Sequence, residues 1–319
     1  MSFGKMNLLA HVLAATLFGL VSQSLAQSQP MSWKLAAGDR FEVTLNQTSS
    51  ANTKVESRKT LIENATTLEM SWDVLKVAGG VATIEQSILG ISLDVNNPAV
   101  PIQAISFDTS ASEEDAKEYS KPSKALLKQI KPLVGLKFNV MMASNGEIKE
   151  VTLTPESAEV INQLPDTVRI RQLFSPQGLT EILGASAILF PEKPIEAGAS
   201  WSDDKSVTTA LGDFTRRRVY TVVGSKTVDG QELTEIQMEP TLVPKQTDEK
   251  KDSVESSLDS KLISFTGSGM LLVDVDGGYL KSSSFENELK SERPYREKTI
   301  ETAVKNQIRM TINKLVEEK

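Results

Sequence analysis

Alternating apolar and polar residues dominate much of the chain after residue 40. The stretch RFEVTLNQTSS at 40–50 begins with the two-residue period of a half-buried strand. Two apolar-rich runs on either side of Gly79-Gly80 predict a hairpin with strands at about 66–77 and 81–95. Strand patterns return in the last third of the chain. The protein is therefore predicted to be mainly β.

Between these β-rich regions, the apolar positions take the spacing of helices. A first helix is predicted at about 115–134. Its apolar face consists of Leu126, Ile130, Leu133 and Val134. Thr154-Pro155 and Ser175-Pro176 each place an N-capping residue before a proline suited to the first helical position. Two further helices are therefore expected within 155–190.

The segment 297–316 fits two patterns. Ile300, Val304, Ile308 and Ile312 fit a helical stripe, whereas Ile308, Met310 and Ile312 alternate as in a strand. The high content of β-branched residues favours a strand.

An internal repeat relates the two halves of the chain. GLKFNVMMASNGEIKEV from Gly135 aligns with GSGMLLVDVDGGYLKSS from Gly267 at a constant offset of 132 residues. AGDRF at 37–41 likewise resembles AGASW at 197–201. Trp72 and Val74 before Gly80 resemble Tyr220 and Val222 before Gly230.

This repeat predicts an α+β fold that is mainly β. A first β-unit with inserted helices spans 27–192, and a second β-unit spans 193–319. We expect the two tandem units to form one large curved antiparallel sheet within one continuous domain, with helices of the first half covering one face.

The segment DVDGG at 274–278 invites comparison with a calcium loop, because Asp274 and Asp276 lie two residues apart. The first copy of the repeat turns at Asn145-Gly146 without any acidic pair. A calcium site needs about six to eight oxygen ligands, and the closing glutamate of the usual loop is absent. We interpret DVDGG as a hairpin turn and assign no metal ligand, cofactor or catalytic residue.

The first 26 residues have the features of an export signal. Lys5 precedes an apolar and small-residue stretch of 14 residues, Leu8 to Val21, which is shorter than the roughly 20 needed to cross a bilayer. The small residues Ser24 and Ala26 predict cleavage after Ala26. The mature chain would have 319 − 26 = 293 residues and a net charge of 34 − 42 = −8. No later run has membrane-spanning length.

The composition excludes several chemistries. The chain has no cysteine, and its single histidine, His11, lies in the predicted signal. Catalytic Ser-His-Asp and Cys-His sets, the usual zinc sites and disulfides are therefore excluded from the mature chain. Carboxylate chemistry remains, so a carboxylate-based hydrolase is kept as a less favoured alternative. The negative charge argues against nucleic acid as a partner.

Two charged motifs are candidates for binding or catalysis. The run Arg216-Arg217-Arg218 could hold an anionic ligand, but strand alternation places Arg217 on the opposite face from the other two. Exposed cross-strand pairing with acidic residues is the favoured interpretation. Asp203 and Asp204 are adjacent, so in a strand they point to opposite faces and do not form an acid–base pair by themselves.

Three segments, together with the export signal, carry a resemblance to a known group of proteins. They are KLAAGDRFEVTLNQ from Lys34, LVGLKFNVMMASNGEIKEV from Leu133 and LFPEKPIEAGASW from Leu189. The chain resembles a family of uncharacterised exported bacterial proteins associated with planctomycetes. The resemblance implies a periplasmic or envelope location and supplies no catalytic residues.

These observations favour an exported, non-catalytic protein of the cell envelope. We expect its curved sheet to bind a hydrophobic or amphipathic small molecule, or another envelope protein. A purely structural or protein-interaction module is the alternative.

Overall fold

A computed structural model describes most of the chain after the predicted signal, which itself lies outside the described residues together with Ala26. The described residues are 31–97, 104–164, 171, 174–186, 188–191, 193, 195–209, 211–245 and 260–316.

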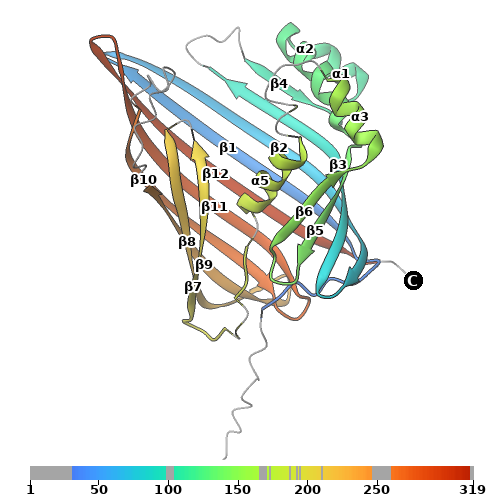
Figure 1. The fold of residues 1–319 in the computed structure, drawn as a ribbon. Coiled ribbons are helices and arrows are strands. Elements are labelled where there is room, and N and C mark those ends of the chain that lie inside the picture. The colour runs from blue at the N-terminus through green and yellow to red at the C-terminus, as the bar shows by residue number, and fades with distance from the viewer. Residues whose placement is uncertain are drawn as a thin grey trace, which may run out of the picture.

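The described residues form one large open antiparallel sheet of 12 strands. The predicted large antiparallel sheet is thereby confirmed. The strands are β1 (Arg40–Val55), β2 (Arg58–Ala78), β3 (Val81–Asn96), β4 (Ile105–Asp108), β5 (Lys137–Ala143), β6 (Ile148–Leu153), β7 (Ser200–Thr209), β8 (Gly212–Val228), β9 (Gln231–Pro244), β10 (Lys261–Asp274), β11 (Tyr279–Tyr295) and β12 (Lys298–Leu315). Their order in the sheet is β6-β5-β3-β2-β1-β12-β11-β10-β9-β8-β7, and β4 pairs with β3. The sheet curves strongly (Figure 1).

The helices are short and begin at capping residues. They are α1 (Glu113–Glu118), α2 (Lys121–Ile130), α3 (Pro155–Gln163) and α5 (Pro176–Ser186), and a 3-10 turn (Lys131–Leu133) follows α2. The starts of α3 and α5 confirm the two predicted Pro positions. The single helix predicted at 115–134 is wrong, because Tyr119 is extended and the Ser120 side chain caps a new helix at Ser123 N.

The helices lie in two places. Helix α5 lies over the concave side of the sheet, and we call this side the concave face (Figure 1). Helices α1, α2 and α3 gather at one end of the sheet, beside β3 and β4. No helix in the described part of the chain is long and apolar enough to span a membrane.

The structure repeats the pattern that the sequence repeats. Strands β1-β2-β3-β5-β6 and β7-β8-β9-β10-β11 follow one another in the same spatial order, with β12 between the two sets. Gly38 N donates to Val74 O at 2.9 Å, and Gly198 N donates to Val222 O at 2.9 Å. Both glycines have positive φ, +92° and +82°. The predicted correspondence of AGDRF with AGASW is therefore confirmed.

The DVDGG segment is the turn between β10 and β11. Asp274 Oδ1 accepts from Gly277 N at 2.6 Å, and Gly278 N donates to Asp274 O at 2.7 Å. Gln231 Nε2 donates to the other carboxylate oxygen of Asp274. One carboxylate oxygen of Asp274 thus closes the hairpin turn, and the other connects the turn to the start of strand β9. Within the described residues, no three acidic or histidine side chains are placed to hold a metal.

The segment after residue 30 joins the two repeated hairpin turns. Trp33 N donates to Ser144 O at 2.7 Å in the β5–β6 turn, and Lys34 N donates to Gly278 O at 2.7 Å in the β10–β11 turn. Gly278 must be glycine, because a Cβ there would lie 2.2 Å from the Lys34 Cβ.

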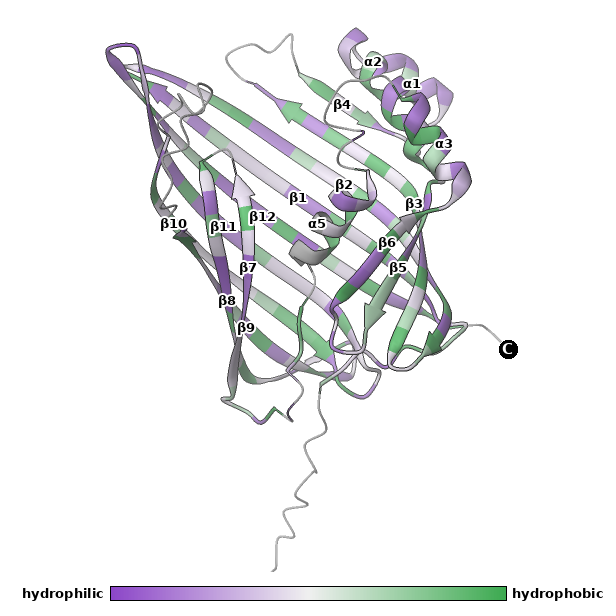
Figure 2. Ribbon diagram, viewed as in Figure 1, coloured by the Kyte–Doolittle hydropathy of each residue, from purple (hydrophilic) through white to green (hydrophobic). Residues whose placement is uncertain are grey.

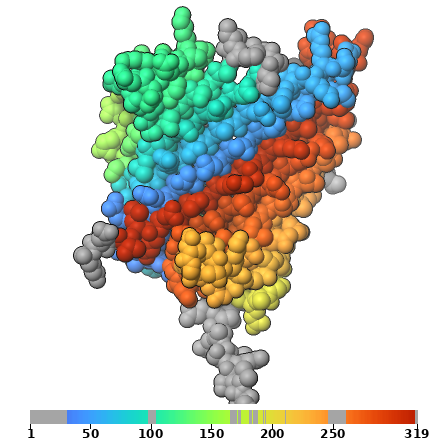
Figure 3. Space-filling view, turned by 180° about the vertical axis from the view of Figure 1, so that it is seen from behind, coloured from blue at the N-terminus to red at the C-terminus, as the bar shows by residue number. Residues whose placement is uncertain are grey.

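The C-terminal segment is a strand, as its β-branched content favoured. Strand β12 pairs with β1 on one side and β11 on the other, so that Val43 lies opposite Ile312. Figure 3 shows these N-terminal and C-terminal strands side by side on the outer side of the sheet. The alternation of apolar and polar side chains along the strands is visible in Figure 2.

Candidate ligand-binding site

The concave face and α5 enclose a small apolar cavity of about 100 Å³. Its floor comes from β1, β2, β3, β5, β6, β11 and β12, and its roof from Phe174 and α5. The lining residues are Trp33, Leu45, Leu68, Met70, Trp72, Gln86, Ile88, Phe138, Met142, Gly146, Ile148, Phe174, Leu179, Leu183, Ile188, Leu280 and Met310. Apart from Gln86, these side chains offer almost only apolar surface.

Three polar atoms of the lining residues are buried without a hydrogen-bond partner. They are Trp33 Nε1, Trp72 Nε1 and Gln86 Oε1. The two indole rings pack with centroids 6.4 Å apart. A buried polar group without a partner costs about 1–3 kcal/mol. Two donors and one acceptor beside an apolar cavity therefore favour a bound molecule that carries its own polar group.

The indole of the second half behaves differently. Trp201 Nε1 donates to Leu189 O at 2.8 Å, so its N–H is satisfied within the protein. Indole N–H groups usually find a partner when buried, which makes the pair Trp33 and Trp72 the exception in this chain.

The roof of the cavity is fixed at one end by the β5–β6 turn. Phe190 N donates to Asn145 O at 2.9 Å. Gly146 has φ +90°, and a Cβ at this position would lie 2.2 Å from Ile188 O and 2.9 Å from Trp33 Nε1. The glycine therefore allows the segment after α5 to approach the turn closely.

Beyond the cavity, a row of polar residues crosses the concave face. Strand register places Ser49 opposite Asn64 on one side and Asn306 on the other, with Asn287 next. Asn306 Nδ2 donates to Asn287 Oδ1 at 3.0 Å. The following row is apolar, since Ala51, Ile62, Val304 and Leu289 occupy the corresponding positions. Along the strands, the concave face therefore changes from the apolar lining of the cavity to a polar row and then to a second apolar row.

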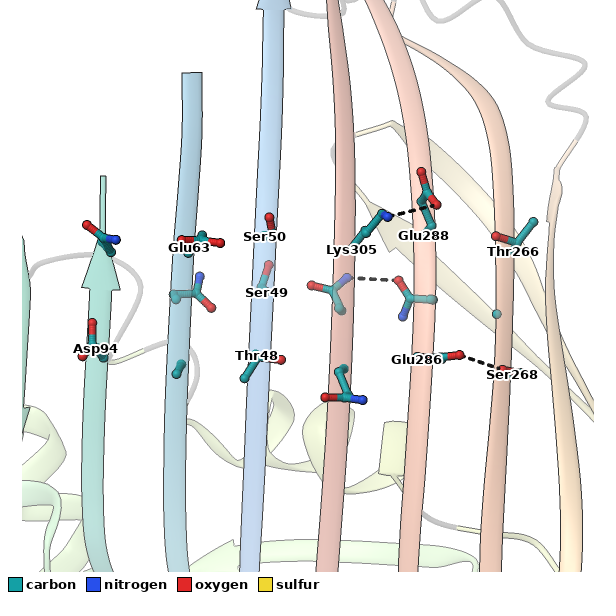
Figure 4. A pocket seen from close by; sticks show the side chains of 17 residues that line it. Thr48, Ser49, Ser50, Glu63, Asp94, Thr266, Ser268, Glu286, Glu288 and Lys305 are labelled. Atoms are coloured by element: carbon teal, nitrogen blue, oxygen red, sulfur yellow. Dashed lines mark hydrogen bonds and ion pairs between the residues drawn. The ribbon is translucent and has the colours of Figure 1, made fainter. Parts of the chain in front are cut away.

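A second hollow, of about 820 Å³, crosses six strands (Figure 4). Its lining includes the polar row on the concave face and also the neighbours of that row along each strand, such as Ser50 and Lys305, which alternation places on the other face. Lys305 Nζ and Glu288 Oε2 are 3.9 Å apart, and the Lys305 side chain is 70% exposed. This hollow is therefore an open polar surface, which suits an apolar ligand poorly.

The arginine run is divided between the two faces, as predicted. Arg217 Nε and Nη2 bind the Asp204 carboxylate at 2.8 and 2.7 Å on the exposed side. Arg218 Nε and Nη2 bind Asp203 on the core side, with Nη2 at 2.6 Å from Oδ2. The prediction of exposed pairing is confirmed for Arg217 and wrong for Arg218, which is only 6% exposed. The two aspartates lie on opposite faces, as expected.

Tyr220 completes the buried ion pair. Its Oη donates to Asp203 Oδ2 at 3.1 Å, and its ring stacks on Trp201 at 5.2 Å between centroids. The Arg218 guanidinium lies 5.7 Å from the centre of the Tyr220 ring. Burial raises the pKa of Tyr220, which therefore stays protonated and keeps donating to Asp203.

The sequence interpretation missed Gln86 and the polar atoms of Trp33 and Trp72 as site features. One signal was present, because Ile84, Gln86 and Ile88 occupy successive core-facing positions of β3. A polar residue at such a position interrupts the apolar pattern and indicates a buried polar group. The missing partners of the two indoles follow only from the tertiary packing.

A family model described as "Family of unknown function (DUF6263)" matches residues 80–278. This match covers more than half of the chain, and the protein belongs to that family. The predicted membership of an uncharacterised family is thereby confirmed, while export and a planctomycete source stay predictions. No curated protein matches the sequence.

Solved structures share only a distant likeness with the sheet. The lipovitellin structure described under lipid–protein interactions is 8% identical with a TM-score of 0.42, covering 92% of this chain and 26% of its own. This protein therefore spans about a quarter of lipovitellin's length. The COG4313 outer membrane channel from Pseudomonas putida F1 is 7% identical with a TM-score of 0.23, covering 88% and 97% of the two chains. A DUF1329 family protein from Desulfovibrio piger is 8% identical with a TM-score of 0.14, covering 86% and 87%.

Proposed function

We propose that this protein binds an amphipathic small molecule whose hydrocarbon part lies between α5 and the concave face. The observation that carries the proposal is the apolar cavity with the unpartnered atoms Trp33 Nε1, Trp72 Nε1 and Gln86 Oε1 beside it. We propose a non-catalytic role in the exported compartment, consistent with the export signal predicted at residues 1–26.

The apolar lining supplies the affinity for a hydrocarbon. Each CH₂ group transferred from water to such a lining contributes about 0.8 kcal/mol. A cavity of about 100 Å³ holds only a short piece of chain, so a longer ligand must displace part of the roof. Helix α5 forms no part of the strand ladder, and it can therefore shift without breaking the sheet.

The polar atoms supply the selectivity for an amphipathic ligand over a pure hydrocarbon. The indole N–H groups of Trp33 and Trp72 can donate to a hydroxyl or carbonyl oxygen, and Gln86 Oε1 can accept from a hydroxyl. A ligand that satisfies these groups removes the cost of their burial, whereas an alkane leaves them unpaired.

The test compares two leucine substitutions on strand β2. Leu68 lines the cavity, and Leu75 is 53% exposed. Binding of dodecan-1-ol to the purified protein is measured by displacement of N-phenyl-1-naphthylamine, a fluorescent apolar probe. We expect Leu68→Phe to weaken dodecanol binding about tenfold by filling the cavity, and Leu75→Phe to leave it unchanged. Equal affinity in both variants, or no binding to the unsubstituted protein, would refute the proposal.

A further inference from the structure

We propose a second binding site on the concave face, in which Arg216 of strand β8 binds the carboxylate of an organic acid. This site lies in the second half of the sheet and does not use the cavity under α5.

The three consecutive arginines differ in the hydrogen-bond partners of one edge of the guanidinium group, the edge formed by Nε and Nη2. In Arg217 and Arg218, Nε and Nη2 together hold the carboxylates of Asp204 and Asp203. In Arg216, Nε and Nη2 are buried and have no hydrogen-bond partner. This edge is the one that fits a carboxylate with two parallel hydrogen bonds. Arg216 therefore has the carboxylate-binding edge of its guanidinium group without a hydrogen-bond partner.

The surroundings of Arg216 supply positive charge. Arg216 and Arg218 share the concave face, and Asp203, opposite Arg218, already accepts from Arg218 and Tyr220. Lys205, on the neighbouring strand β7, lies directly opposite Arg216. A carboxylate bound at Arg216 would therefore lie near two further cationic side chains, which favours an anionic ligand.

The neighbours of Arg216 are also suited to the apolar part of an organic acid. Phe214, two residues earlier on the same face of β8, is 3% exposed. Leu242, on the neighbouring strand β9, lies directly opposite Arg216. Since Nε and Nη2 are covered in this conformation, the Arg216 side chain must turn toward the open side of the sheet to receive a ligand. Its flexible stem permits this, because no hydrogen bond holds those two atoms.

The internal repeat supports a special role for this position. Trp72 corresponds to Tyr220, so Leu68, four residues before Trp72, corresponds to Arg216. In the first half this position lines the apolar cavity, and in the second half it carries a guanidinium. The position faces the concave side in both halves, but its chemistry is different.

The experiment measures dodecanoate binding to the full mature chain by isothermal titration calorimetry, with Arg216→Gln as the test variant. Arg217→Gln is the matched control, because Arg217 is adjacent and points to the opposite face. We expect Arg216→Gln to weaken dodecanoate binding at least tenfold, as loss of a charged hydrogen-bonding partner does, and Arg217→Gln to change it less than twofold. Arg216→Lys should restore only part of the affinity, because lysine lacks the two-pronged edge.

Propionate and dodecan-1-ol distinguish the possible ligands. Stabilisation of the unsubstituted protein, but not of Arg216→Gln, by propionate at constant ionic strength would identify a site for small carboxylates. An Arg216-dependent effect of dodecanoate alone would identify a fatty-acid-like ligand. If Arg216→Gln binds both acids as the unsubstituted protein does, or if neither acid binds, the carboxylate site is refuted. Dodecanol binding that depends on Leu68 would persist in that case, so the two proposals fail separately.

Discussion

The two halves of the sheet have the same backbone arrangement but carry different side chains on the concave face. In the first half, Val43 pairs with Met70, and both side chains are buried in the apolar core. At the corresponding register of the second half, Asp203 pairs with Arg218. One cross-strand position is thus an apolar contact in one copy and a buried ion pair in the other.

This difference shows that the repeat conserves hydrogen bonds of the backbone rather than the chemistry of the concave face. The bonds from Gly38 to Val74 and from Gly198 to Val222 have the same length, 2.9 Å. Strand pairing uses only backbone groups, so the side chains of either face can change while the ladder remains. A duplicated sheet can therefore carry an apolar cavity in one half and a charged cluster in the other.

The largest effect is expected when the buried ion pair loses one partner. Asp203→Asn should lower the free energy of unfolding by about 3–5 kcal/mol, because it removes the negative charge that the buried Arg218 guanidinium pairs with at Asp203. Urea unfolding followed by circular dichroism measures this loss.

A triple variant sharpens the same comparison. Asp203→Val with Arg218→Met and Tyr220→Phe installs the apolar pair of the first half and removes the hydroxyl that Asp203 accepts from. We expect this variant to recover the unsubstituted stability to within about 1 kcal/mol or to exceed it, since apolar packing often replaces a buried ion pair at no cost. A triple variant as unstable as Asp203→Asn would show that the apolar pair of the first half cannot replace the ion pair of the second half.

A smaller effect of opposite sign is expected at Arg216. Arg216→Leu introduces the residue type that Leu68 has at the corresponding place, and it removes a half-buried charge with two unpartnered donors. We expect stability to rise by about 1 kcal/mol, measured as a higher urea midpoint at unchanged slope. Destabilisation by Arg216→Leu would indicate that the guanidinium stabilises the folded chain.

The smallest effect is expected at the exposed pair of Arg217 and Asp204. Hydrogen bonding to Arg217 lowers the pKa of Asp204 from its ordinary 3.8. A depressed folded-state pKa stabilises the protein above the unfolded pKa, and this contribution is lost as the pH falls through the folded value. Because both side chains are exposed to solvent, Arg217→Gln should leave the unfolding midpoint at pH 7 almost unchanged.

The control for this prediction is the acid limb of the stability curve. Unfolding midpoints between pH 5 and pH 2 should fall slightly less steeply in Arg217→Gln than in the unsubstituted protein, and 1 M salt should remove the difference. A large change at pH 7 would mean that the pair is protected from solvent.

Much of the fold was accessible from local patterns. Alternation predicted the strands, Thr154-Pro155 and Ser175-Pro176 predicted two helix starts, and the first copy of the repeat correctly indicated that DVDGG is a turn. These features depend on residues close together in the chain, so a short stretch of sequence contains their cause. The break between α1 and α2 was missed, because Ser120 caps a new helix within a continuous helical pattern.

The sequence by itself determined which residues share a face of each strand, where the chain turns and that the chain contains two related halves, since all three follow from periodicity and turn residues. The tertiary structure decided that β12 lies between β1 and β11, that Arg218 and Asp203 are buried, and that Trp33, Trp72, Gln86 and Arg216 have buried polar atoms without partners. The physical reason is that burial and hydrogen-bond satisfaction depend on neighbours from distant parts of the chain, whereas alternation depends only on the strand itself.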